Sequence, residues 1–136
     1  MITRNLTISS TYESLRNATN AVRSVLSEAG IADEVIGICE LAVQELLTNL
    51  VEHAYKEDTT KSIKIFISFD NNRLLVETED FGETVNLDLD AIQMPDPTDL
   101  QVGGYGIAIL KSLMDRVEYT RKDGKNIWRI EKLIFN

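Results

Sequence analysis

Residues 62–80, SIKIFISFDNNRLLVETED, contain two apolar runs separated by Asp70, Asn71 and Asn72. Both runs are rich in isoleucine, leucine, valine and phenylalanine, and their pattern is typical of β-strands. Asparagine tolerates the left-handed backbone conformation that a tight turn requires, so the stretch predicts a β-hairpin. The two strands are therefore expected to pair antiparallel, which indicates a mostly antiparallel sheet.

Upstream of this hairpin, the pattern predicts one strand and two helices. Residues 4–10, RNLTISS, alternate between polar and apolar side chains like a first strand. Ser10 or Thr11 can cap the helix that follows, and Gly30 ends it. Asp33 begins a second helix of about 24 residues. The apolar stripe predicted to face the core on this second helix consists of Ile36, Val43, Leu47, Leu50 and Ala54.

Downstream of the hairpin, the sequence from Asp80 to Gly104 is acidic and contains prolines. A loop of this length inside a compact domain is usually functional or disordered. The sequence again shows helical spacing over residues 105–117. It then predicts two strands, residues 117–122 and 126–135, which are joined by an Asp-Gly turn. The order of elements predicts an α+β fold, a two-layer sandwich of a mostly antiparallel mixed sheet with helices on one face.

Composition limits the functions that the chain can have. Its 136 residues, 43% hydrophobic and 26% charged, fit one domain, residues 1–136. No apolar run approaches the roughly 20 residues needed to cross a bilayer, and no signal peptide is evident, so we expect a cytoplasmic protein without membrane contact. A net charge of −8 argues against direct binding of nucleic acid. The single cysteine, Cys39, is expected in the core.

The second predicted helix carries polar residues at four-residue intervals within ELLTNLVEHAY, residues 45–55. Glu45, Asn49 and His53 share one stripe of such a helix. An asparagine oxygen is a suitable ligand for Mg²⁺, and a carboxylate one turn earlier can act as a general base. The same spacing is also common on solvated helix faces, and His53 and Tyr55 are expected to have structural roles.

A second motif, VETEDFGETV, places Asp80 at the end of a strand and Gly82 two residues later. A carboxylate in this position can accept a hydrogen bond from the exocyclic amine of adenine, and the glycine lets the backbone approach the base. Asp-x-Gly is also an ordinary turn sequence.

A third motif, GGYGIAIL, places Gly103, Gly104 and Gly106 at the start of a helix. Glycines there leave backbone amides free to meet a phosphate, which the helix dipole also favours. The motif lacks the Lys-Ser/Thr of a Walker loop, and a hinge is the alternative interpretation. The three motifs are chemically complementary, since they suit magnesium, adenine and phosphate.

Taken together, the motifs resemble those of the GHKL ATP-binding superfamily, and within it the small anti-sigma factor serine/threonine kinases. The resemblance covers nearly the whole chain, including its C-terminal hairpin. The matching segments are Glu45-Leu-Leu-Thr-Asn49 with His53-Ala-Tyr for the N box, Asp80-Phe-Gly82 for the first glycine box, and Gly104-Tyr-Gly106 for the second.

This resemblance implies ATP and Mg²⁺ as cofactors, with a nucleotide lid at about residues 83–104. It implies that Glu45 is the general base, that Asn49 holds Mg²⁺ and that Asp80 reads adenine. The further residues that it implies for nucleotide binding are Gly82, Gly104 and Gly106. Lys111 is a candidate for neutralising phosphate charge because residues 87–106 contain no lysine or arginine.

The resemblance also implies a partner-switching function. Such a kinase phosphorylates a STAS-domain anti-anti-sigma protein, and its freed surface then sequesters a sigma factor or another switched target. Relatives of this kind often form homodimers, so a homodimer is one expected assembly.

Two departures from the family pattern bear on activity. Thr84 stands where the first glycine box usually has its second glycine, and residues 87–106 contain no lysine or arginine. Turnover is then expected to be slow or confined to a complex with a partner. The alternatives are a non-catalytic nucleotide-binding module that sequesters a partner, the catalytic domain of a histidine kinase, which normally has a helical phosphoacceptor domain attached, and an ATPase of the gyrase kind.

Overall fold

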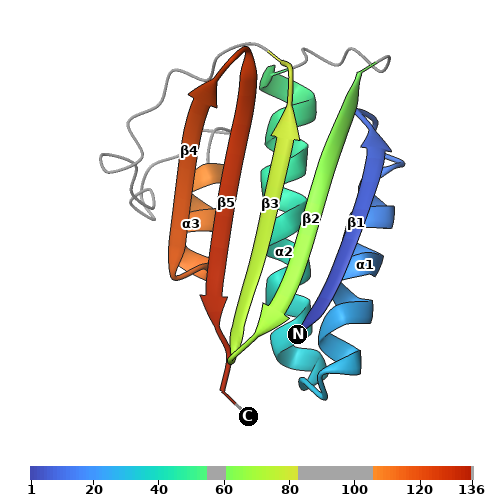
Figure 1. Cartoon of the computed structure of the whole chain (residues 1–136), viewed down its shortest axis with the longest axis vertical. Coiled ribbons are helices and arrows are strands. Elements are labelled where there is room, and N and C mark those ends of the chain that lie inside the picture. Colours follow the sequence, from blue (N-terminus) through green and yellow to red (C-terminus); the bar gives the residue numbers. More distant parts are fainter. Residues whose placement is uncertain (55–60, 83–105, 136) are drawn as a thin grey trace, which may run out of the picture.

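The computed structural model describes residues 1–54, 61–82 and 106–135, and Figure 1 shows their arrangement. The strands are β1 (Ile2–Ser9), β2 (Ser62–Asp70), β3 (Arg73–Asp80), β4 (Arg116–Lys122) and β5 (Lys125–Leu133). The helices are α1 (Leu15–Glu28), α2 (Asp33–Asn49) and α3 (Gly106–Leu113), and a π-helical segment, η1 (Leu50–Ala54), continues α2. No helix in these ranges is long and apolar enough to cross a bilayer.

The predicted α+β two-layer sandwich is confirmed. The strands form one sheet in the spatial order β1-β2-β3-β5-β4, and every described pairing is antiparallel. All three helices cover the same face of this sheet (Figure 1). Both predicted hairpins form, with positive φ angles at Asn71 and Asn72 in the first turn and at Asp123 and Gly124 in the second.

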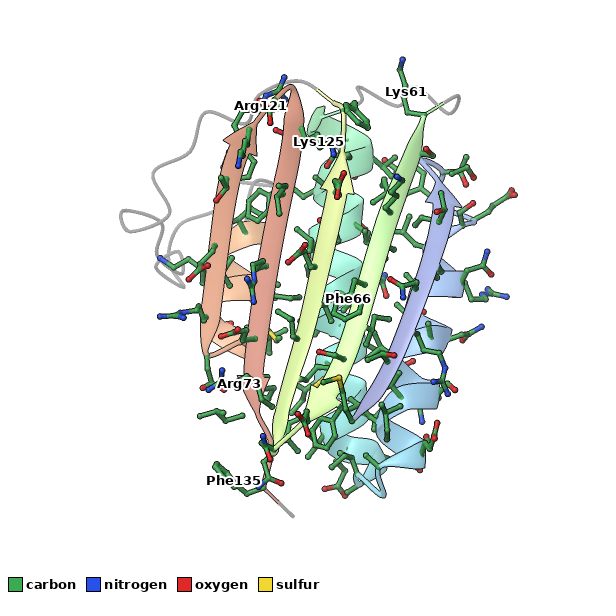
Figure 2. All side chains as sticks on the ribbon, viewed as in Figure 1. Lys61, Phe66, Arg73, Arg121, Lys125 and Phe135 are labelled. Carbon is green, nitrogen blue, oxygen red and sulfur yellow. The ribbon has the colours of Figure 1, made fainter. Side chains whose placement is uncertain are left out.

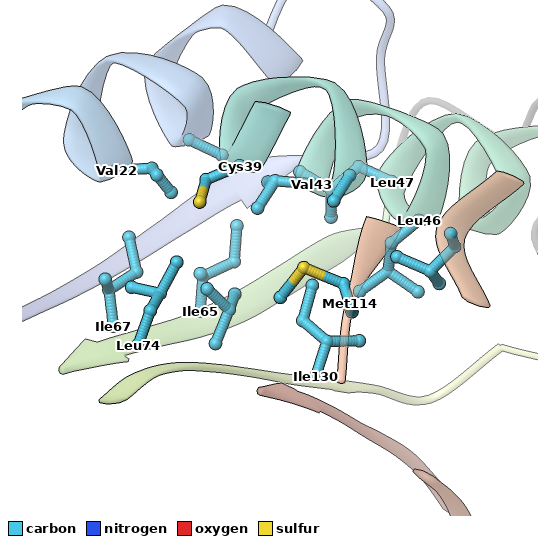
Figure 3. Packing of buried hydrophobic residues seen from close by; sticks show 14 of the residues in the cluster. Val22, Cys39, Val43, Leu46, Leu47, Ile65, Ile67, Leu74, Met114 and Ile130 are labelled. Atoms are coloured by element: carbon cyan, nitrogen blue, oxygen red, sulfur yellow. The ribbon is translucent and has the colours of Figure 1, made fainter. Parts of the chain in front are cut away.

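The hydrophobic core lies between the helices and the sheet, where Val43 and Leu47 of α2 face residues of the strands (Figure 3). Four residues of the predicted stripe, Ile36, Val43, Leu47 and Leu50, are buried, which confirms the prediction for them. The side chain of Ala54 lies outside the described residues. Cys39 is buried as predicted, and desolvation raises the pKa of its thiol to about 11.

The predicted start of the first helix was wrong. α1 begins at Leu15 with Ser14 as its N-cap, rather than directly after Ser10 or Thr11. The hydroxyl of Ser10 donates to the carbonyl of Lys61 at 3.2 Å. The hydroxyl of Thr11 accepts the backbone N–H of Ser14 at 3.1 Å. Both side chains thus stabilise the connection between β1 and α1, where side-chain hydrogen bonds compete with helix formation.

The second helix is not regular over its predicted length. The α-helical part ends at Asn49, and the five residues of η1 follow with π-helical hydrogen bonding. π-helical turns are frequent at functional sites, and this one begins directly after a residue of the N-box motif.

The third helix is shorter than predicted and ends at Leu113. The backbone N–H of Asp115 already donates to the carbonyl of Glu131 in β5 at 2.9 Å. Pairing with β5 therefore takes over where the periodicity still favours a helix, because a tertiary partner overrides local propensity.

Candidate active site

The C-terminal end of α2, the end of β3 and the turn between β4 and β5 lie at the same end of the sandwich (Figure 1). Glu45 and Asn49 are in the last two turns of α2, and both are partly exposed. Their neighbours Leu46, Leu47 and Leu50 are fully buried. These leucines anchor the helix in the core, so that Glu45 and Asn49 share the accessible stripe expected from their spacing.

The structure brings Glu45 together with Gly106, the first residue of α3. A Cβ atom added to Gly106 would lie only 3.1 Å from Oε2 of Glu45. The absence of a side chain at Gly106 therefore makes room for this carboxylate beside the start of α3. A helix N-terminus carries about half a positive charge, which favours anionic groups such as carboxylates and phosphates. Residues of the first and third motifs, Glu45 and Gly106, thus lie next to each other in the structure.

Asp80 is the last residue of β3 and is fully buried. Its Oδ1 atom accepts hydrogen bonds from the backbone N–H of Gly82 at 2.8 Å and from Nδ2 of Asn126 at 3.0 Å. Its Oδ2 atom is also buried, yet it has no hydrogen-bond partner among the described residues. A buried carboxylate oxygen without a donor is costly, and a ligand with an N–H group at this point would satisfy it.

Two further buried polar atoms lack partners in the same part of the described sheet. They are Oγ1 of Thr78 and Nε1 of Trp128, and these residues are directly opposite each other in the pairing of β3 with β5. Thr78 precedes Asp80 by two residues, so both side chains point to the helix-covered face. This patch of the sheet thus combines a hydroxyl, an indole N–H and a carboxylate oxygen that are all buried without a hydrogen-bond partner among the described residues.

The β4–β5 hairpin holds the segment that follows Asp80. Nη1 of Arg121 donates to the carbonyl of Gly82 at 2.7 Å. Nζ of Lys125 forms an ion pair with Glu79 at 2.7 Å and lies 5.7 Å from the ring centroid of Phe81. Figure 2 shows Arg121 and Lys125 at the end of the sheet where β3 ends.

The match to known families comes from the sequence as a whole. A family model described as the histidine kinase-like ATPase domain matches residues 8–132. The chain belongs to this family. The serine-protein kinase RsbW of Bacillus subtilis is 31% identical over 109 residues, which cover 76% of this chain and 68% of that protein. RsbW of Staphylococcus epidermidis is 29% identical over 133 residues, which cover 93% of this chain and 82% of that protein. The resemblance to anti-sigma factor serine kinases is thereby confirmed.

Two solved structures share the fold of this chain. The RsbU and RsbW domains of a Mycobacterium tuberculosis protein superpose with a TM-score of 0.69 at 17% identity, over 97% of this chain and 32% of that one. A chain of the SiaB–SiaC complex from Pseudomonas aeruginosa superposes with a TM-score of 0.62 at 12% identity, over 96% of this chain and 89% of that one. The three α-helices and five strands of the described residues thus share the fold of these two structures.

Some of the predicted site residues of this family member lie outside the described residues. The whole lid predicted at about 83–104, with Thr84, Gly103 and Gly104, lies there, and so do Tyr55 and the side chain of His53. Lys111 is described, and it lies in the last turn of α3, about 7.5 Å along the helix axis from Gly106 at the usual rise per residue. Its assignment to phosphate binding stays a prediction.

The donor set around Asn49 suits Mg²⁺ better than a transition metal. No group of three or more His, Cys, Asp or Glu side chains that could hold a metal ion occurs among the described residues. Magnesium does not need one, because it keeps several water ligands and is usually bound by one or two protein oxygens together with substrate phosphates. The amide oxygen of Asn49 fits that role.

Sequence reasoning missed Thr78, Asn126 and Trp128. The alternation of β3 places Thr78 on the same face as Asp80, so the sequence contained a signal for this residue. Asn126 and Trp128 become neighbours of Asp80 and Thr78 only through the pairing of β5 with β3. No local sequence pattern predicts this pairing, because α3 and β4 separate the two strands in the chain.

Proposed function

We propose that this kinase uses ATP and Mg²⁺ to phosphorylate a serine or threonine of a STAS-domain anti-anti-sigma protein. The observation that supports this most is the position of the Glu45 carboxylate against Gly106 at the start of α3. A general base then lies beside the helix N-terminus that suits the phosphates, which is the arrangement that phosphoryl transfer requires.

The nucleobase is bound at the end of β3. The free, buried Oδ2 of Asp80 accepts a hydrogen bond from the exocyclic amine of adenine. Gly82, Gly104 and Gly106 are assigned to nucleotide binding by their match to the family motifs, since glycine has no side chain to block a ligand, and Lys111 contributes positive charge toward the phosphates. Adenine and phosphate are thus held by different elements, the end of β3 and the start of α3.

The transfer step depends on Glu45. Its carboxylate takes the proton of the partner's hydroxyl group while that oxygen forms a bond to the γ-phosphorus and the bond between the γ-phosphorus and the oxygen of ADP breaks. Asn49 holds Mg²⁺, which neutralises phosphate charge when bound. The protein's contribution is mainly positioning and electrostatic stabilisation, so this small set of side chains is sufficient.

Phosphorylation also explains the release of the partner. A phosphoserine adds about −1.5 to −2 charges at neutral pH, and this chain already has a net charge of −8. Repulsion favours dissociation, and the freed kinase then sequesters a sigma factor or another switched target. Because sigma factors act on cytoplasmic RNA polymerase, the proposal places the chain in the cytoplasm.

Incubation with STAS-domain proteins of the same organism, Mg²⁺ and ATP radiolabelled on its γ-phosphorus tests this function. We expect one STAS protein to acquire an acid-stable label on serine or threonine, and no transfer when Mg²⁺ is chelated. Acid-labile label on a histidine would instead support a histidine kinase. Binding of ATP and of a STAS protein without any transfer would support a non-catalytic sequestration module.

Gly106→Ala is expected to separate folding from transfer. Alanine favours the helix over glycine by up to about 1 kcal/mol, so the melting temperature should stay the same or rise. The new methyl group would lie 3.1 Å from Oε2 of Glu45 and displace that carboxylate. A contact this close requires the carboxylate to move by a few tenths of an ångström. Since misplacing a catalytic group by about 1 Å can cost 10²-fold, we expect a shift of this size to slow transfer by about two- to fivefold.

The matched control is Gly37→Ala on the exposed side of α2, where an added Cβ has no neighbour within 4 Å. It should raise the melting temperature slightly and leave transfer unchanged. Transfer at the wild-type rate in Gly106→Ala would mean that the packing of Glu45 against α3 is not part of the mechanism.

A further inference from the structure

Asn126 is a fully buried amide that directly faces Asp80 across the β3–β5 pairing. Its Oδ1 atom accepts hydrogen bonds from the hydroxyl of Tyr119 at 2.5 Å and from Nη1 of Arg121 at 3.0 Å. Two donors converge on this oxygen, so the amide cannot flip without placing its N–H groups against them. Nδ2 of Asn126 is therefore kept toward the carboxylate of Asp80, to which it donates at 3.0 Å.

This orientation determines which oxygen of Asp80 is left free. Both described donors, Nδ2 of Asn126 and the backbone N–H of Gly82, bind Oδ1. Oδ2 remains buried without a partner in the described part of the chain. Rotation of the carboxylate would break two hydrogen bonds, so the acceptor offered to a ligand has a fixed position.

We propose that Asn126, held by Tyr119 and Arg121, is a positioning residue that fixes Oδ2 of Asp80 toward the nucleobase and so selects a 6-aminopurine. This inference rests on the proposed function, because it takes the ligand at the end of β3 to be the base of ATP. It assigns the β4–β5 hairpin, remote from Glu45 in the sequence, to nucleotide selection.

The selection follows from the chemistry of an ionised carboxylate, which only accepts hydrogen bonds. A 6-amino group donates to Oδ2, whereas a 6-oxo group would place its lone pairs against it. Discrimination of this kind is largest when the site's buried polar group cannot find another partner. Without Asn126, the carboxylate can rotate and hydrate, so both its affinity for the amine and its preference against a 6-oxo group should fall.

Ligands that differ only at the 6-position give the test. Dissociation constants are measured for ATP and for purine riboside triphosphate, which lacks the 6-amino group, with the full chain and with Asn126→Leu. We expect wild type to prefer ATP by roughly tenfold or more, the usual scale for a hydrogen bond to a charged group. Asn126→Leu should lose most of this preference by weakening ATP binding, while the analogue binds within about twofold of wild type.

Tyr119→Phe provides a second variant in case Asn126→Leu does not fold. It removes the hydroxyl and keeps the ring, whose centroid lies 4.9 Å from that of Trp128. It should reduce the ATP preference by a smaller factor. Thr120→Ala, at the exposed position next to it in β4, is the matched control and should leave both constants unchanged. At saturating ATP, Thr120→Ala should also transfer phosphate at the wild-type rate, because it lies outside the hydrogen-bond network around Asp80.

Equal weakening of both ligands would assign Asn126 a merely structural role and overturn the inference. The inference would also be overturned if both variants preferred ATP as strongly as the wild type does. In those cases ATP binding and the proposed function would still stand. If the wild-type chain binds neither ligand, the proposed function itself fails.

Discussion

Glu45→Gln is expected to slow phosphoryl transfer to the STAS partner by about 10² to 10⁴-fold, the usual range for loss of acid–base assistance. Glutamine has nearly the same shape as glutamate, so it fits the space beside Gly106 that the carboxylate now occupies. It lacks the basic oxygen that accepts the hydroxyl proton. Binding of Mg²⁺ and ATP should remain within about twofold of wild type, because a base acts in the chemical step.

Single-turnover transfer measured by rapid quench, together with calorimetry of ATP binding, separates these two effects. Glu34→Gln, the same change at an exposed position in the first turn of α2, should leave both unchanged. In the cell, Glu45→Gln should hold the unphosphorylated partner, so the sigma factor stays active. Transfer by Glu45→Gln at the wild-type rate would show that Glu45 is not the base.

Much of the fold could be predicted because it depends on local signals. Asn71 and Asn72 adopt the left-handed conformation that their side chains tolerate, and Asp123 with Gly124 does the same in the second hairpin. The apolar stripe of α2 follows from helical periodicity alone. Hairpins and amphipathic helices are encoded within about 20 residues, so one sequence is enough to recognise them.

Strand order was not predictable in this way, and the missed site residues follow from that. Asn126 belongs to no sequence motif. It lies beside Asp80 only because β5 is located between β3 and β4 in the sheet. The start of α1 was missed for a related reason, since the hydroxyl of Ser10 binds Lys61, which is distant in the sequence. The motifs on α2, β3 and α3 could be recognised because each carries its chemistry on one element.

Asp80→Asn is expected to weaken ATP binding by roughly 10- to 100-fold, which corresponds to losing a charged hydrogen bond of about 1.5–3 kcal/mol. The donors of Gly82 and Asn126 fix an acceptor at the Oδ1 position, so the carbonyl of the introduced amide should take that place. Its NH₂ group then replaces Oδ2. A donor would face the 6-amino group of adenine, and both hydrogen bonds that hold the segment would be kept.

The preference between bases should therefore reverse rather than disappear. Inosine triphosphate presents a 6-oxo acceptor to the introduced NH₂ group, so its affinity should rise relative to ATP in Asp80→Asn. Calorimetric titration of both nucleotides measures this ratio directly. Asp70→Asn, the same substitution at the exposed opposite end of the β2–β3 hairpin, should not alter it. A loss of equal size for both nucleotides would mean that Asp80 supports the end of β3 without contacting the base, since only a direct contact distinguishes a donor from an acceptor at the 6-position.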